Sequence, residues 1–270
     1  MTPLLADAHT HLDQFAPEEA PAILQRARDA GVGLLIVAGV HEESSHKAIA
    51  LAEAHEGVYA GVGIHPEEAK GPLTGDDYLR LKALAQSSPR VVCISEVGLD
   101  FAPNMPPIDV QEQVLRQEVR LARELGLPVI FHSREYPGRL SDHEEVLRVL
   151  SEEGVHEVGG AWHYFQWDEA LAQKCFNLGL SVSISKTLLR LPALQDVVRY
   201  LPLERLLLET DSFPQPFKRH RSRWTEPKDV RLVAEKVAEL KGVSVETVAR
   251  ATTDNLLRLL RGKVALPTRT

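Results

Sequence analysis

The sequence predicts an α/β fold of the TIM (β/α)8 barrel class, in which eight parallel strands are each followed by a helix. Short runs rich in β-branched and aliphatic residues alternate with amphipathic helical stretches, and there are eight such runs. The chain has 270 residues, close to the roughly 250 that one such barrel needs. It contains no linker, short-period repeat or low-complexity tract. We therefore expect one domain over residues 1–270.

The expected strands are buried apolar runs of four to seven residues bounded by turn residues or polar side chains. In chain order they cover residues 4–9, 33–38, 58–64, 91–96, 129–132, 158–163, 180–185 and 205–209.

The expected helices have apolar residues at three- and four-residue spacing. Asp109 is the expected N-cap of the longest helix, and Gly126 its stop. Seven helices connect the strands, at residues 18–30, 44–54, 78–86, 110–125, 142–152, 167–177 and 192–199. Three more follow the last strand, at 227–240, 244–250 and 254–261.

Composition excludes several classes of protein. The net charge is −7 and the pI is near 5.9, so any attraction for nucleic acid has to be local. Cys93 and Cys175 lie far apart, which argues against a disulfide framework and for a reducing compartment. No apolar run approaches 18 residues and the N-terminus has no leader pattern. We expect a cytoplasmic protein with no membrane partner and no obligate protein partner.

Ligand-capable side chains follow several of the expected strands. In a barrel the carboxyl ends of the strands meet at one rim, where active sites lie. A single histidine there is more often structural, but the joint pattern favours a two-metal hydrolytic centre with a bridging carboxylate. His9 and His11 are two residues apart on an extended strand, so their side chains project from the same face and can bind one ion together. The six side chains are His9, His11, Glu96, His132, His163 and Asp211.

Five segments resemble the TatD family of metal-dependent hydrolases in sequence, order and spacing. They are His-Thr-His-Leu-Asp at 9–13, Gly-Ile-His-Pro at 63–66, Ser-Glu-Val-Gly-Leu-Asp at 95–100, Leu-Pro-Val-Ile-Phe-His-Ser-Arg at 127–134 and Leu-Glu-Thr-Asp at 208–211. The resemblance runs from Leu4 to about Leu260. It implies a barrel of the metal-dependent amidohydrolase type, a divalent-metal centre and deoxyribonuclease activity, here expected as a 3′-to-5′ exonuclease.

The resemblance also implies roles for the six side chains. His9, His11, Glu96 and Asp211 match the ligands of one ion, and Glu96, His132 and His163 those of a second, so that Glu96 bridges. Asp211 is the expected general base for the attacking water. Glu209 is expected to contact the metal ligands rather than a metal ion itself. Zinc, magnesium and manganese all remain open as the metal.

Substrate contacts are expected around the same rim. His65 resembles the family's substrate-contacting histidine, and its alternative is a turn residue. Arg134 offers a planar fork suited to phosphate. The densest basic run follows the last strand and either binds phosphate or is ordinary solvated surface. Its cations are Lys218, Arg219, Arg221 and Arg223.

Departures from the family pattern affect the mouth of the barrel. Tyr164 stands where relatives have cysteine, and Phe213 alters the turn after the last strand. The aromatic residues of these loops either stack on bases or pack the loops, with packing favoured. They are Tyr164, Phe165, Trp167, Phe213 and Trp224.

Three functions follow, in decreasing order of support. The leading one is a phosphodiesterase acting on DNA ends or single strands. The second is a metal-dependent deacylase or amidohydrolase, for example on aminoacyl-tRNA esters, because the same activated water attacks either centre. The third is an inactive binding scaffold, which is disfavoured because no ligand of the pattern is missing.

Overall fold

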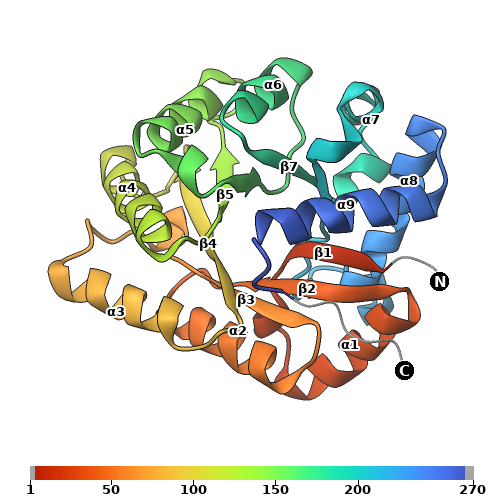
Figure 1. The fold of residues 1–270 in the computed structure, drawn as a ribbon, viewed down its shortest axis with the longest axis horizontal. Coiled ribbons are helices and arrows are strands. Elements are labelled where there is room, and N and C mark those ends of the chain that lie inside the picture. Colours follow the sequence, from red (N-terminus) through yellow and green to blue (C-terminus); the bar gives the residue numbers. More distant parts are fainter. Residues whose placement is uncertain (1–3, 265–270) are drawn as a thin grey trace.

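The computed structural model describes residues 4–264, so residues 1–3, where the sequence predicts no leader, and residues 265–270 lie outside the described residues. Eight parallel strands form one sheet in the order β1 to β8, which confirms the predicted TIM barrel (Figure 1). The strands are β1 Leu5–Thr10, β2 Val32–Ala38, β3 Val58–Val62, β4 Val91–Asp100, β5 Val129–Arg134, β6 Gly160–Trp162, β7 Ser181–Ile184 and β8 Leu206–Leu208.

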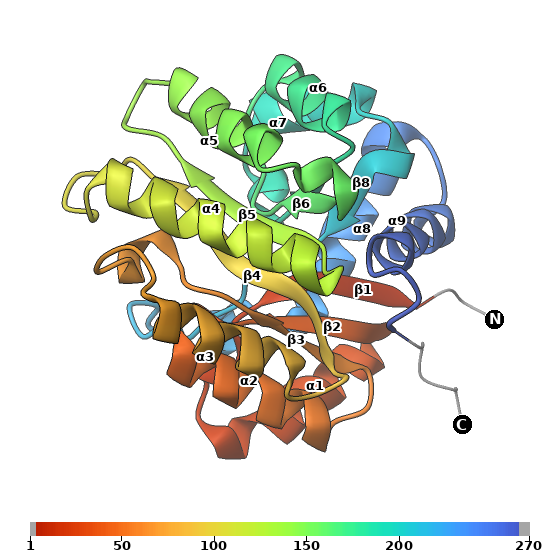
Figure 2. The same ribbon diagram turned by 60° about the vertical axis from the view of Figure 1, so that its left-hand side comes forward.

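Helices surround the strands, and Figure 2 shows α3, α4 and α5 packed around their outside. In the described residues, no helix combines the length and the apolar character needed to cross a membrane. The helices are α1 Ala20–Asp29, α2 Glu42–Ala54, α3 Gly75–Gln86, α4 Ile108–Leu125, α5 Ser141–Glu152, α6 Glu169–Asn177, α7 Pro192–Tyr200, α8 Val230–Lys241 and α9 Val245–Leu259.

Two helical predictions were wrong in detail. The helices expected at 244–250 and 254–261 are one continuous helix, α9, within which the hydroxyl of Thr252 donates to the carbonyl of Val248 and so needs no turn to satisfy it. Thr253 donates to the Leu4 carbonyl and ties the helix to the first strand. Helix α4 begins at Ile108 and places Asp109 in its first turn, where its carboxylate still favours the helix N-terminus.

The apolar residues form two clusters. The larger one lies between the strands and the surrounding helices. The smaller one combines side chains from seven of the eight strands, such as Leu34, Ile130 and Leu207, with Leu256 and Leu260 at the chain's C-terminal end. Side chains from strands around the whole ring meet only inside the barrel, so this cluster fills its interior. Helix α9 covers that interior, as Figure 1 shows.

The two ends of the sheet meet beside the polar rim. The His11 N–H donates to the carbonyl of Ser212 at 2.8 Å, and the Asp211 N–H donates to that of His9 at 3.0 Å. Strand β4 continues past its expected end at Glu96 because Val97 and Leu99 still pair with β5. Glu96 therefore lies within a strand rather than at its tip.

Candidate metal centre

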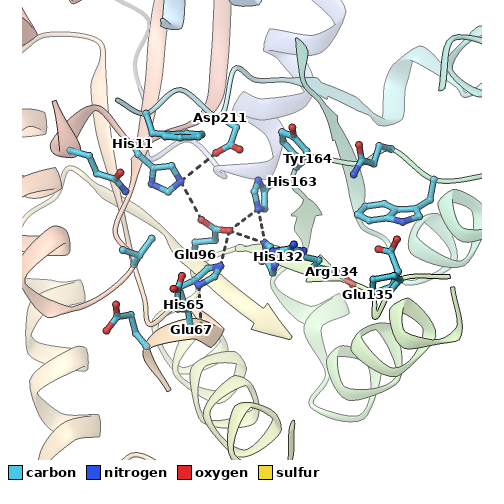
Figure 3. Close-up of a pocket in the computed structure, with 18 residues that line it drawn as sticks. His11, His65, Glu67, Glu96, His132, Arg134, Glu135, His163, Tyr164 and Asp211 are labelled. Carbon is cyan, nitrogen blue, oxygen red and sulfur yellow. Dashed lines mark hydrogen bonds and ion pairs between the residues drawn. The ribbon is translucent and has the colours of Figure 1, made fainter. Parts of the chain in front are cut away.

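A cavity of about 630 Å³ opens at the carboxyl ends of the strands. Figure 3 shows Glu96 at its centre, with imidazole rings from β5 and from the segments directly after β1, β3 and β6 pointing at its carboxylate. The sequence-predicted residues that line this cavity are His11, His65, Glu96, His132, Arg134, His163 and Asp211, while His9 is buried directly behind them.

The two oxygens of Glu96 face different histidines. Oε2 lies 3.2 Å from His9 Nε2 and 3.4 Å from His11 Nε2. Oε1 lies 2.7 Å from His163 Nε2 and 3.2 Å from His132 Nδ1. One carboxylate thus stands between two separate sets of nitrogen atoms, the arrangement that a bridging ligand requires.

Asp211 closes the first of these sets. Its Oδ1 lies 3.4 Å from His11 Nε2 and 4.0 Å from His9 Nε2. The residue has φ of 48°, a left-handed backbone that is uncommon for a residue other than glycine. This turn after β8 directs the carboxylate toward the histidines of β1, with 19% of the side chain exposed.

The outer nitrogen of His11 hydrogen-bonds to a carbonyl oxygen, and those of two further histidines lie near a carboxylate oxygen. An acceptor beside the outer nitrogen favours the proton there, so that the inner nitrogen would be the one to ligate a metal. The pairs are His11 Nδ1 with the Ala38 carbonyl at 3.2 Å, His132 Nε2 with Asp100 Oδ2 at 3.3 Å, and His163 Nδ1 with Glu209 Oε1 at 3.6 Å.

The outer nitrogen of His65 accepts a hydrogen bond, whereas that of His11 donates one. His65 Nδ1 accepts the backbone N–H of Glu67 at 3.1 Å, and its Nε2 lies 3.5 Å from Glu96 Oε1. Burial lowers the pKa of His65 to about 4, so the ring is neutral at pH 7. With Nδ1 occupied as an acceptor, the single ring proton lies on Nε2, which faces the cavity as a donor.

The carboxylates of the centre attract positive charge strongly. Burial alone would raise the pKa of Glu96, but His163, His65 and His9 lower it well below its usual value. Burial would also raise the pKa of Asp211, and the hydrogen bond from His11 lowers it. In the described part of the chain, no lysine or arginine lies within ion-pair distance of either carboxylate. Imidazole and carboxylate donors of this kind fit divalent cations.

Two residues outside the cavity position its walls. The buried carboxylate of Glu118 in α4 accepts the N–H of Ile64 at 2.7 Å and so holds the backbone directly before His65. Gly98 has φ of 149°, and a Cβ there would lie 2.0 Å from the carbonyl oxygen of His132. Only glycine allows β4 and β5 to approach this closely.

The expected substrate contacts separate into two groups. Arg134 lies at the cavity with 60% of its side chain exposed, 3.8 Å from Asp100, and Lys218 lines a neighbouring cavity. Arg219 and Arg223 are exposed and line neither cavity. Arg221 instead forms ion pairs with acidic side chains and lies over an aromatic ring: Glu19 and Glu226 are each at 2.8 Å, and the Trp224 ring centroid is at 4.6 Å.

The aromatic residues also divide. Phe165 is fully buried, and Trp224 packs against Phe15, so both side chains pack the loops. Tyr164 and Phe213 line the cavity, as does Trp167, which stacks on Trp162.

Sequence reasoning missed the role of Asp100. It was quoted in a motif but lies four residues beyond the expected end of its strand, and only the extension of β4 brings it to His132. Lys186 and Arg190, after β7, were also missed because that strand carries no ligand-type residue.

Comparison with known proteins identifies the family. The model of the TatD related DNase family matches residues 6–261. The chain belongs to the TatD family. It is similar to the uncharacterized metal-dependent hydrolase YabD of Bacillus subtilis, with 33% identity over 96% of this chain and 99% of YabD. It is also similar to the human deoxyribonuclease TATDN3, with 32% identity over 94% of each chain.

A solved TatD structure agrees with the fold. The crystal structure of YjjV, a TatD homologue from Escherichia coli K12, has a TM-score of 0.83 and 30% identity, and covers 96% of this chain and 98% of YjjV. With the family match, this makes the chain a metal-dependent hydrolase of the TatD family.

Proposed function

We propose that this TatD family hydrolase is a phosphodiesterase that cleaves DNA at strand ends or in single strands, using two divalent ions. The observation that carries the proposal is the placement of Glu96 between two sets of nitrogen atoms. One ion would be held by His9, His11, Glu96 and Asp211, and the second by Glu96, His132 and His163. When bound, such ions lower the pKa of a water and offset the charge of a phosphate.

Asp211 supplies the proton acceptor in this proposal. It is ionised at neutral pH because His11 lowers its pKa, and it lies at the edge of the cavity. A carboxylate there accepts a proton from the water that attacks phosphorus. Glu209, fully buried behind His163, holds that ring and is not exposed to substrate.

His65 is assigned to the substrate rather than to a metal. Its Nε2 lies near Glu96 and His132, in a group of atoms close enough to hold an ion. The proton on Nε2, however, makes this atom a donor, and a donor binds a phosphate oxygen. Arg134, at the open side of the cavity, adds a second donor for the same anion.

Parallel assays on matched substrates test the proposed activity. The enzyme is purified without added metal, its metal content is measured, and it is assayed with zinc, magnesium or manganese on single-stranded DNA labelled at the 3′ or the 5′ end, on duplex DNA and on an acyl ester. We expect loss of single nucleotides from single strands, starting at the 3′ end. Hydrolysis of the ester with no cleavage of any DNA would contradict the proposal and favour the deacylase.

A further inference from the structure

A second cavity of about 470 Å³ adjoins the metal centre on the side of β7 and β8. Tyr164, Asp211 and Phe213 line both cavities, so these side chains lie between the two spaces. Tyr164 and Asp211 both have left-handed backbones, with φ of 55° and 48°. Strained backbone of this kind is retained where the surrounding structure fixes it, often at functional sites.

Three cations line the second cavity: Lys186, Arg190 and Lys218. Lys186 is paired with Asp229, its Nζ lying 2.7 Å from Oδ2. The Nζ of Lys218 bonds only to neutral oxygens, those of the Gln215 side chain at 2.6 Å and the Arg223 carbonyl at 3.2 Å. Among the described residues, no carboxylate lies within ion-pair distance of Lys218 or Arg190, and the three cations outnumber the one carboxylate that lines the cavity, Asp211 on the wall shared with the metal centre.

The pKa of Lys218 is consistent with the excess of cations in this cavity. Burial and the neighbouring charges of Lys186 and Arg190 lower this pKa, and the charge of Asp229 opposes them in part. Three cations held this close repel one another, and a bound anion relieves that repulsion.

The opposite wall of the metal-centre cavity carries mainly negatively charged side chains. Glu67 and Glu68, after β3, and Glu135, after β5, line it beside Arg134. A polyanion that enters the metal centre is therefore repelled on the β3 and β5 side and attracted on the β7 and β8 side. Phe217, 73% exposed at the rim of the second cavity, offers a ring face to a nucleoside there.

We propose that the cavity lined by Lys186, Arg190 and Lys218 binds a second phosphate of the substrate strand, the one adjacent to the phosphate that is cleaved. This inference rests on the proposed phosphodiesterase function. It implies that the substrate strand leaves the metal centre between Tyr164 and Asp211, toward β7 and β8. A substrate with a single phosphate gains nothing from this cavity.

Four substrates and two variants test this site. The substrates are a DNA trinucleotide, its two positional isomers in which one or the other linkage is a neutral methylphosphonate, and bis(4-nitrophenyl) phosphate. The variants are Arg190→Gln and Lys218→Gln. Arg199→Gln, an exposed residue of α7 outside both cavities, is the control with the same change of charge.

We expect each variant to lose about tenfold more kcat/KM on the trinucleotide than on bis(4-nitrophenyl) phosphate, mainly through KM, because one charge-assisted hydrogen bond is removed. The isomer in which the methylphosphonate replaces the linkage that is not cleaved should show no such excess loss. Equal losses on all substrates, no loss at all, or the same loss in Arg199→Gln would overturn the proposal.

Failure of the proposed function has a separate signature. If the wild type hydrolyses bis(4-nitrophenyl) phosphate or an acyl ester but no DNA, the nuclease proposal is wrong. The cavity is then tested through inhibition of that hydrolysis by the trinucleotide. Weaker inhibition of Arg190→Gln and Lys218→Gln than of the wild type supports the phosphate site, and equal inhibition overturns it.

Discussion

The rings of His11 and His65 hydrogen-bond to the backbone in opposite senses. His11 Nδ1 donates to the carbonyl of Ala38 at 3.2 Å, whereas His65 Nδ1 accepts the N–H of Glu67 at 3.1 Å. Because Nδ1 of His11 donates, its inner nitrogen is the one that would ligate a metal ion after losing its proton, whereas the inner nitrogen of His65 is a donor. Two histidines near the same carboxylate are thus prepared for different partners, one for a metal ion and one for an anion.

This difference predicts opposite phenotypes. His11→Ala should lose metal from the first site, because one of the ion's nitrogen ligands is removed. His65→Ala should keep the metal content of the wild type and lose about tenfold or more in kcat/KM, because a hydrogen bond to the substrate is lost. Elemental analysis after dialysis, together with kinetics, separates the two. Loss of metal from His65→Ala would make His65 a ligand.

Asp211→Asn tests the proposed proton acceptor. The amide preserves the shape of the side chain but is a much weaker base, so turnover should fall by roughly 10²-fold or more while KM changes little. Single-turnover kinetics at a fixed metal occupancy measure this. Normal turnover would remove Asp211 from proton transfer.

Arg221 and Arg219 should behave differently despite belonging to one basic run. Arg221 pairs with the buried carboxylate of Glu226, so Arg221→Ser should lower the free energy of unfolding by about 1 kcal/mol. Arg219→Ser, at an exposed position, is the matched control and should leave stability unchanged within about 0.5 kcal/mol. Urea unfolding measures both. Equal stabilities would show that the Arg221 ion pairs contribute nothing.

Glu118 predicts a pH dependence of stability. Burial raises its pKa well above the usual value, so the folded state keeps a proton that the unfolded state releases near pH 4.3. The contribution of Glu118 to stability is therefore full below that pH and is lost as pH rises toward the folded-state pKa, by about 1.4 kcal/mol per pH unit. Glu118→Gln should remove this slope and keep the hydrogen bond to Ile64. An unchanged slope would show that Glu118 is ionised in the fold.

The sequence was sufficient for the barrel because strand periodicity and helical spacing are local patterns, and all eight strands occur in the predicted order. It also indicated which side chains would converge, since strand ends in a barrel share one rim. It could not place Asp100, because nothing in the local pattern shows that β4 continues past Glu96 to pair with β5.

Properties that depend on packing between distant segments were beyond sequence reasoning. The opposite orientation of His11 and His65 depends on which backbone groups lie beside each ring. The cavity with Lys186, Arg190 and Lys218 joins the loops after β7 and β8, which lie side by side because these two strands pair. The division of the basic run likewise depends on Glu19, which is 202 residues from Arg221 in the chain and is brought to it only by the fold.

The metal content of Glu96→Ala tests the central claim most directly. Metal per chain is measured after dialysis of the wild type, Glu96→Ala and His163→Ala. The bridging arrangement predicts two ions per chain in the wild type, loss of both ions and of activity in Glu96→Ala, and loss of mainly one in His163→Ala. Retention of two tightly bound ions and full activity by Glu96→Ala would contradict it.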